Sequence, residues 1–271
     1  MRMPTSRIAP FVVVSLTACA ISVQREVELG NQYAAELARE LPLVEDPAVQ
    51  QAIDDFMQPI LAHTTRPELP WTVAVVNAEM VNAFAVPGGH LYVTRGLIEA
   101  ARGYDELAGV MGHEMAHVDL RHSVDQLQKA TVAETGVTVG YVLLGREPGD
   151  VEKAALNVTA AAVFAKFSRD DEREADRASV AYMTRAGINP EGLIRMFETL
   201  ASLQQDRPGV VEQFFASHPM TDDRITDVRA LIAADPAAQR AVRTGVRDRP
   251  IFGRLQSLVR RLPAPPPPKR Q

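Results

Sequence analysis

Two histidines four positions apart, His113 and His117, are the residues of this sequence best suited to chemistry. Neither glycine nor proline interrupts the stretch from His113 to Val118, which favours a helix. Positions i and i+4 lie on one face of a helix, so both imidazoles can bind the same metal ion. Glu114 projects beside them and can reach a water on that ion. Because neutral imidazole and carboxylate suit zinc, we expect one Zn²⁺ per chain.

An acidic segment further along the chain offers the remaining ligands. Glu172 and Asp176 are four residues apart in a strongly helical stretch and therefore share a face. We predict that Glu172 is the third metal ligand and that Asp176 accepts a hydrogen bond from a ligand histidine, fixing its tautomer. Glu174 is the alternative ligand, although on a helix it points about 200° away from Glu172. The other charged residues of the segment are expected to be solvated: Asp170, Asp171, Arg173 and Arg177.

The surrounding sequence predicts an α+β fold that is mainly α-helical. β-branched residues predict a strand over 71–76, and strands over 81–86 and 90–94 flank Pro87-Gly88-Gly89, which suits an antiparallel turn. We therefore expect a small antiparallel β-sheet, packed by the helix that carries His113. Helical spacing and capping residues predict helices over 23–41, 47–61, 105–122, a run into 144, 150–167, 169–186, from 189 onward and 222–234.

Two further histidines are not predicted to be ligands. His122 follows His117 by five residues, so a helix that continues to 122 directs it away from the ligand face. His63 lies far from the motif in sequence.

Composition narrows the possible functions. The chain has 271 residues, of which 46% are hydrophobic and 23% charged, enough to bury a full core. A net charge of −5 argues against binding nucleic acid through a basic surface. The single cysteine excludes an intramolecular disulfide and a cysteine-rich zinc site, so a metal site must use histidine and carboxylate. The oligomeric state stays unknown at this level.

The N-terminal segment predicts export. Arg2 and Arg7 precede a short apolar run over 11–16, as in a secretory signal peptide. Leu16-Thr17-Ala18-Cys19 resembles the lipobox of bacterial lipoprotein precursors, in which the cysteine carries lipid; an ordinary signal peptide with a chance cysteine is the alternative. We expect lipidation at Cys19 to anchor the protein, since each buried CH₂ contributes about 0.8 kcal/mol. Ala20, rather than Asp, resembles the sorting signal for the periplasmic face of the outer membrane.

Taken together, His113-Glu-x-x-His117 and Glu172-x-x-Ala-Asp176 resemble the zinc metallopeptidases of the CAAX-prenyl-protease and HtpX type. Three further segments match the family: residues 82–97, Ser168-Arg169, and Ser217-His218-Pro219 with Arg224. The resemblance covers about residues 23–231. It is strongest to the periplasmic lipoprotein members, of the LoiP sort.

The resemblance implies roles for individual residues. Glu114 would act as the general base of peptide hydrolysis. His218 would approach from the C-terminal segment and hydrogen-bond the oxyanion, with Arg224 supporting it. In some relatives this histidine is thought to occupy the open zinc position and hold the enzyme latent, and a structural role for His218 is the remaining alternative.

The strand block ahead of the zinc helix is the predicted substrate-binding region. An extended peptide can add as a further strand along its exposed edge, through main-chain hydrogen bonds. This mode needs little sequence specificity and suits unfolded or misfolded protein substrates; the alternative is that the strands only support the helix. The candidate substrate-binding residues are Asn82, Ala83, Phe84, Gly89, His90 and Leu91.

The predicted organisation has three parts: a lipoprotein signal peptide over 1–18, a zinc metallopeptidase domain over 19–235, and a C-terminal helix with a proline-rich tail over 236–271. The predicted function is a zinc endopeptidase acting on unfolded or misassembled bacterial envelope proteins. A latent chaperone or assembly factor of the same fold, with little proteolysis, is the alternative.

Overall fold

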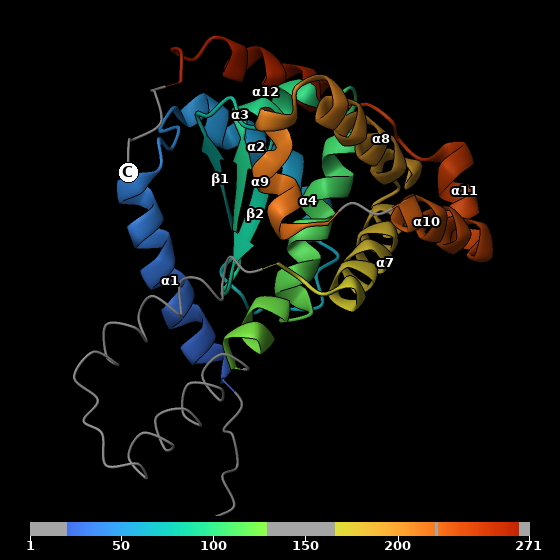
Figure 1. The fold of residues 1–271 in the computed structure, drawn as a ribbon, viewed down its shortest axis with the longest axis horizontal. Coiled ribbons are helices and arrows are strands. Elements are labelled where there is room, and N and C mark those ends of the chain that lie inside the picture. Colours follow the sequence, from blue (N-terminus) through green and yellow to red (C-terminus); the bar gives the residue numbers. More distant parts are fainter. Residues whose placement is uncertain (1–20, 129–165, 220–221, 266–271) are drawn as a thin grey trace, which may run out of the picture.

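The computed structural model describes residues 21–128, 166–219 and 222–265 (Figure 1). Outside these residues lie the predicted signal peptide with Cys19, most of the helical run into 144, most of the predicted helix over 150–167, and the end of the proline-rich tail. The strands are β1 (Thr72–Val76), β2 (Ala83–Val86) and β3 (His90–Thr94). The helices are α1 (Val23–Glu40), α2 (Pro47–Leu61), α3 (Arg95–Ala100), α4 (Tyr104–Asp119), α7 (Arg169–Arg185), α8 (Glu191–Asp206), α9 (Pro208–Ser217), α10 (Asp222–Ala234), α11 (Pro236–Thr244) and α12 (Pro250–Arg260).

The three strands form a mixed sheet in the order β1-β3-β2. The β2–β3 pair is antiparallel, as predicted, with Phe84 opposite Tyr92. The prediction of a wholly antiparallel sheet is wrong for β1, which runs parallel to β3 with Thr72 opposite His90. The reason is that the segment after β1 carries the chain to the far edge, so β3 returns between β1 and β2. The mainly helical α+β fold class is confirmed.

The sheet lies between α1 on one side and the helices of the main core on the other (Figure 1). Its outer face presents Val76, Val86 and Tyr92, which pack against Tyr33 and Leu37 of α1. Its inner face belongs to the main core together with α2 and α4. The alternation of side chains along a strand produces this division.

Helix α4 runs through the middle of the molecule, and all of its residues are buried. Two glycines let the neighbouring helices approach it closely. A Cβ on Gly109 would lie 2.8 Å from Cα of Leu193 in α8, and one on Gly112 would lie 2.9 Å from Oγ of Ser179 in α7. Close packing on both sides therefore fixes the helix that carries His113 and His117.

Several predicted boundaries change in the structure. Helix α4 ends at Asp119 rather than 122, because Arg121 adopts a left-handed φ of 62° and turns the chain. Helix α9 was not predicted, and the segment after 236 holds two helices, of which α12 packs against α2 and α3. Within the described part of the chain, no helix combines the length and apolar character needed to cross a bilayer.

Candidate metal centre

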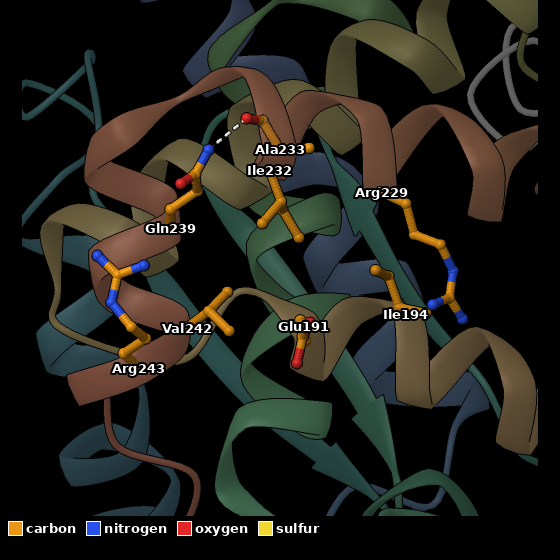
Figure 2. A pocket seen from close by; sticks show the side chains of 8 residues that line it. All are labelled: Glu191, Ile194, Arg229, Ile232, Ala233, Gln239, Val242 and Arg243. Carbon is orange, nitrogen blue, oxygen red and sulfur yellow. Dashed lines mark hydrogen bonds between the residues drawn. The ribbon is translucent and has the colours of Figure 1, made fainter.

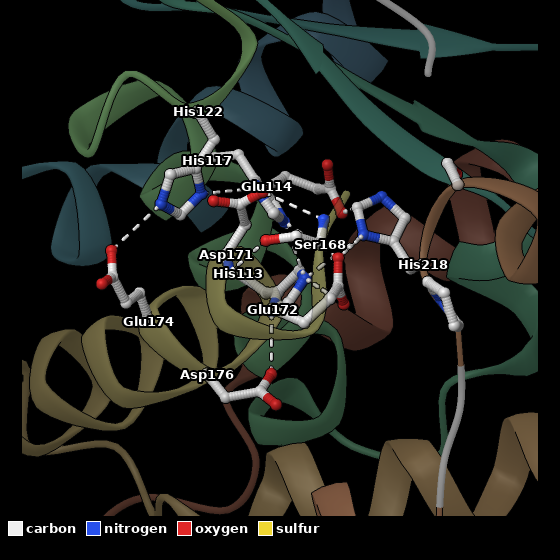
Figure 3. A network of polar contacts seen from close by, with 12 residues as sticks. His113, Glu114, His117, His122, Ser168, Asp171, Glu172, Glu174, Asp176 and His218 are labelled. Atoms are coloured by element: carbon white, nitrogen blue, oxygen red, sulfur yellow. Dashed lines mark hydrogen bonds and ion pairs between the residues drawn. The ribbon is translucent and has the colours of Figure 1, made fainter. Parts of the chain in front are cut away.

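Four buried side chains converge where α4, α7 and the end of α9 meet (Figure 3). His113 and His117 come from α4, Glu172 from the first turn of α7, and His218 from the residue that ends α9. Each offers one donor atom, and these atoms lie within 4.8 Å of one another. The structure therefore brings together the three ligands predicted from spacing and the histidine implied by resemblance.

The distances between the donors match what zinc requires. Nε2 of His113 lies 3.0 Å from Nε2 of His117 and 3.5 Å from Glu172 Oε2. Nδ1 of His218 lies 3.0 Å from Glu172 Oε1 and 3.4 Å from His113 Nε2. Zinc bonds of about 2.0–2.1 Å in a tetrahedron place ligand atoms roughly 3.3 Å apart. A buried, nitrogen-rich donor set with this spacing can bind Zn²⁺.

The start of α7 positions the carboxylate ligand. Ser168 caps the helix: its side chain accepts a hydrogen bond from Asp171 N, while its own N–H donates to Asp171 Oδ2 at 2.9 Å. This capping box fixes the first turn, where Glu172 stands. Asp171, predicted to be merely solvated, thus helps to begin the ligand helix.

Behind His113, a second carboxylate and an arginine hold the ligands. Asp176 Oδ1 lies 2.9 Å from Nδ1 of His113, on the opposite side of the ring from Nε2. Arg224 donates two hydrogen bonds to Asp176, at 2.9 and 2.7 Å, and its Nη1 lies 2.7 Å from Glu172 Oε2. Asp176 thus lies beside a predicted ligand histidine, within hydrogen-bond distance of its far nitrogen. Arg224 contacts these carboxylates rather than His218.

Residues that the sequence analysis did not assign to the site surround His117. The ring of Phe167 stacks on that of His117, with centroids 3.8 Å apart. On the edge of the ring away from the donors, Nδ1 of His117 lies 2.9 Å from Nδ1 of His122. Glu174, the alternative ligand, lies beside His122 and not among the donors (Figure 3). The left-handed turn at Arg121, which the sequence pattern does not reveal, brings His122 back towards His117.

The electrostatics of the centre follow from burial and opposite charges. Burial would raise the pKa of Glu172, but the charge of His113 and hydrogen bonds from the surrounding histidines outweigh it and lower that pKa strongly. Burial would likewise raise the pKa of Asp176, and the neighbouring Arg224 lowers it. Burial raises the pKa of Glu114. A carboxylate with a raised pKa is suited to accept and return a proton near neutral pH.

A groove of about 230 Å³ reaches Glu114 and His218 from the surface. Asn82 and Phe84 of the predicted substrate-binding residues line it. The other four predicted residues do not: Ala83 and Leu91 are fully buried, and Gly89 sits in the turn with a φ of 97°. Both ring nitrogens of His90 already have partners: Nδ1 lies 2.8 Å from Oγ1 of Thr72, and Nε2 lies 3.0 Å from Oδ1 of Asn31 in α1. The groove is completed by Leu37, Leu41, Met80, Ala85, Phe167, Gln213 and Ser217.

A second hollow lies apart from the histidines, among α8, α10 and α11 (Figure 2). Its volume is about 390 Å³, and its charged lining residues are Glu191, Arg229 and Arg243. It contains none of the residues predicted to act in chemistry. The candidate site is therefore the histidine cluster and its groove.

The fold and the donor set together define the site of a zinc metallopeptidase. Residues 45–232, more than half of the chain, match the family described as peptidase family M48. The chain belongs to peptidase family M48.

Curated relatives come from bacteria and from mitochondria. The chain is 28% identical over 218 residues to the beta-barrel assembly-enhancing protease of Escherichia coli K12, covering 77% of this chain and 44% of that protein. It is 34% identical over 167 residues to metalloprotease LoiP of E. coli K12, covering 61% and 64% of the two chains. With the mitochondrial metalloendopeptidase OMA1 of Saccharomyces cerevisiae it shares 29% over 180 residues, 64% of this chain and 50% of that protein. The chain thus spans less than half the length of the assembly-enhancing protease.

Proposed function

We propose that this chain is a zinc-dependent endopeptidase. The observation that carries the proposal is the placement of buried Glu114 beside three histidine nitrogens and a carboxylate at tetrahedral spacing. When bound, zinc lowers the pKa of a coordinated water to about 7 and polarises the substrate carbonyl. His113, His117 and Glu172 would hold the ion. Glu114 would accept the proton of the attacking water and deliver it to the departing amine.

A single substitution tests this function. In Glu114→Gln the side chain keeps its shape and loses its basicity, so zinc content should equal that of the wild-type protein. Hydrolysis of an unfolded protein such as reduced casein should fall by about 10²–10⁴-fold. Glu198→Gln, which changes an exposed acid of α8 away from the donor cluster, serves as the matched control. A Glu114→Gln protein with full zinc and undiminished cleavage would refute the proposal.

We further propose that substrates are unfolded or misassembled protein chains bound in extended form. Strand β2 lies at an edge of the sheet, and its residue Phe84 lines the groove that reaches Glu114. Main-chain pairing to an edge strand requires an extended, unfolded segment but little sequence identity. Leu37 of α1, Leu41 directly after that helix, and Met80 offer apolar surface for substrate side chains.

The proposed site of action is the bacterial envelope. The similarity to the beta-barrel assembly-enhancing protease of E. coli supports this placement. We propose export through residues 1–18 and lipid attachment at Cys19, which would anchor the chain at the periplasmic face of the outer membrane. Fractionation tests the anchor: wild-type protein should sediment with outer membranes and Cys19→Ser should be released. A Cys19→Ser protein that stays in the membrane fraction would contradict it.

The position of His218 favours a second candidate, a latent chaperone or assembly factor of the same fold. Catalytic zinc sites keep one position open, whereas closed four-ligand sites are structural. Here Nδ1 of His218 stands among the donors, so a zinc ion would have four protein ligands. Wild-type and Glu114→Gln proteins that bind zinc equally and both lack detectable cleavage would favour this second function.

A further inference from the structure

The far nitrogen of His117 has a partner that no motif of the sequence assigns. Nε2 of His117 faces the donors, 3.5 Å from Glu172 Oε1, while Nδ1 lies 2.9 Å from Nδ1 of His122. Both side chains are buried: the exposed fraction is 1% for His117 and 4% for His122. Because a buried ring nitrogen needs a hydrogen-bond partner, this contact decides which nitrogen of His117 carries the proton.

A second contact extends this row of side chains from His117 and His122 to Glu174. Nε2 of His122 lies 3.4 Å from Oε2 of Glu174, a carboxylate whose side chain is 57% exposed. Figure 3 shows His122 between Glu174 and His117. The contact is long for a hydrogen bond, so Glu174 should contribute less than His122 does.

One arrangement of protons satisfies every atom in this row. A metal ligand must present an unprotonated Nε2, so His117 carries its proton on Nδ1 and donates it to His122. Neutral His122 then accepts at Nδ1 and carries its own proton on Nε2, directed at Glu174. His117 thus has an acceptor for its far nitrogen, as His113 has in Asp176.

The fold holds His122 firmly in this place. Helix α4 ends at Asp119, the chain turns at Arg121 with a φ of 62°, and His122 begins the next helical stretch. The side chain of Arg121 is fixed by Glu26, with Nη1 3.0 Å from Oε2. Phe167 covers the face of the His117 ring, so stacking and the His122 contact together restrain its tilt and rotation.

We propose that His122 is a positioning residue for the metal centre: it accepts the Nδ1 proton of His117, and Glu174 in turn orients His122. It is not a ligand, because the side chains able to share one ion among the described residues are His113, His117, Glu172 and His218. This inference rests on the proposed zinc site. Loss of such partners weakens metal binding by about 10- to 100-fold in other proteins.

Zinc affinity of the purified protein, measured by competition with a chromophoric chelator, tests this role. His122→Phe keeps a ring but removes the acceptor, and we expect zinc binding to weaken by about 10- to 100-fold. His122→Asn can place an amide oxygen near the former Nδ1, so its affinity should return to within about fivefold of wild type. Glu174→Gln should weaken binding by about two- to fivefold, consistent with the long contact. His63→Phe, a histidine outside the cluster, is the control and should change nothing.

Two further readouts separate positioning from a structural role. At saturating zinc, His122→Phe should lower kcat for a peptide with KM unchanged, and the visible absorption bands of its Co²⁺ form should shift. His122→Phe that binds zinc within twofold of wild type, or His122→Asn that binds no better than His122→Phe, would overturn the proposal.

The proposal stays testable if His122→Phe does not fold or if the wild-type protein binds no zinc. If His122→Phe does not fold, weakened binding by Glu174→Gln with near-normal binding by His122→Asn supports positioning, and any other result overturns it. Wild-type protein that binds no zinc would instead refute the proposed function itself, which keeps the two failures distinct.

Discussion

Asp176 Oδ1 lies 2.9 Å from Nδ1 of His113, which faces the donor cluster with its other nitrogen. The carboxylate fixes the proton on Nδ1 and leaves the lone pair of Nε2 for the metal. Arg224 binds both oxygens of Asp176 and so holds it in this orientation. The ligand, the carboxylate and the arginine form one buried unit reaching from α4 through α7 to α10.

Neutralising this carboxylate should weaken the metal site. We expect Asp176→Asn to bind zinc about 10- to 100-fold more weakly than wild type, because His113 loses its charged acceptor and Arg224 its partner. Chelator competition measures the effect. Asp170→Asn is the matched control on the same helix, since the Asp170 side chain is 84% exposed and pairs only with Arg173 among the contacts described. Equal affinities for the two variants would contradict the role of Asp176.

A buried ion pair fixes α1, the helix that forms one wall of the groove. Glu26 is fully buried and accepts two hydrogen bonds from Arg66, at 2.8 and 2.9 Å, while Arg121 lies 3.0 Å away. Removing one partner of a buried pair leaves an uncompensated charge. Glu26→Gln should therefore lower the free energy of unfolding by about 3 kcal/mol, measured by urea denaturation.

The control for this prediction, Glu28, lies two residues further along α1. Glu28 pairs with Arg25 in solvent, with side chains 62% and 55% exposed. Surface pairs contribute little, so Glu28→Gln should change stability by less than about 0.5 kcal/mol. Similar losses in both variants would show that burial of Glu26 does not matter.

The sequence was sufficient to predict which side chains on regular helices meet at the candidate metal centre. The i, i+4 spacing of His113 and His117 and the shared face of Glu172 and Asp176 follow directly from helix geometry, and the structure places all four as that geometry requires. The resemblance to a family supplied His218, whose position in sequence carries no periodic signal. Its place at the end of α9 depends on a helix that the pattern did not reveal.

Residues placed by irregular backbone or by tertiary packing could not be predicted in this way. His122 lies next to His117 only because the backbone of Arg121 adopts a positive φ instead of a helical one. A positive φ is uncommon for a residue other than glycine, so the sequence does not predict it here. Phe167 stacks on His117 although it is distant in sequence, and the N–H of Phe167 donates to the carbonyl of Ser217. The parallel pairing of β1 with β3 is likewise non-local, since local turn signals describe only the β2–β3 hairpin.

Asp105 at the start of α4 should make stability depend on pH. Burial raises the pKa of Asp105 to about 6, although Arg195 forms an ion pair with it. A folded-state pKa above the unfolded value means that its stabilising contribution is complete below about pH 3.8 and is lost as pH rises through about 6. Relative to Asp105→Asn, the wild-type protein should therefore lose about 1 kcal/mol between pH 5 and 7.5, allowing for solvent screening.

Urea unfolding of both proteins at several pH values checks this expectation, because effects of other titrating groups cancel in the difference. Glu198→Gln, which removes an exposed carboxylate paired with Arg229, is the control and should show no such trend. A stability difference between wild type and Asp105→Asn that is flat from pH 5 to 7.5 would contradict the raised pKa.

Removing His218 should increase peptide hydrolysis. Its Nδ1 lies 3.0 Å from Glu172 Oε1 and 3.4 Å from His113 Nε2, the spacing of a fourth ligand. His218→Ala would leave that position to water, which a catalytic site needs. We expect initial rates on a quenched fluorescent peptide, at saturating zinc, to rise severalfold. His63→Ala, which removes a histidine outside the donor cluster, should leave the rate unchanged.

A lower rate for His218→Ala would instead assign His218 the role of hydrogen-bonding the oxyanion, which the resemblance implies. A fall of tenfold or more in kcat with zinc binding retained would mean that His218 stabilises the oxyanion, since loss of one such donor costs about 10²–10³ in kcat. Its Nε2 lies 3.4 Å from Glu114 Oε1, so the imidazole stands next to the proposed general base. Because the two roles change the rate in opposite directions, one variant measured at saturating zinc distinguishes a blocking ligand from a catalytic donor.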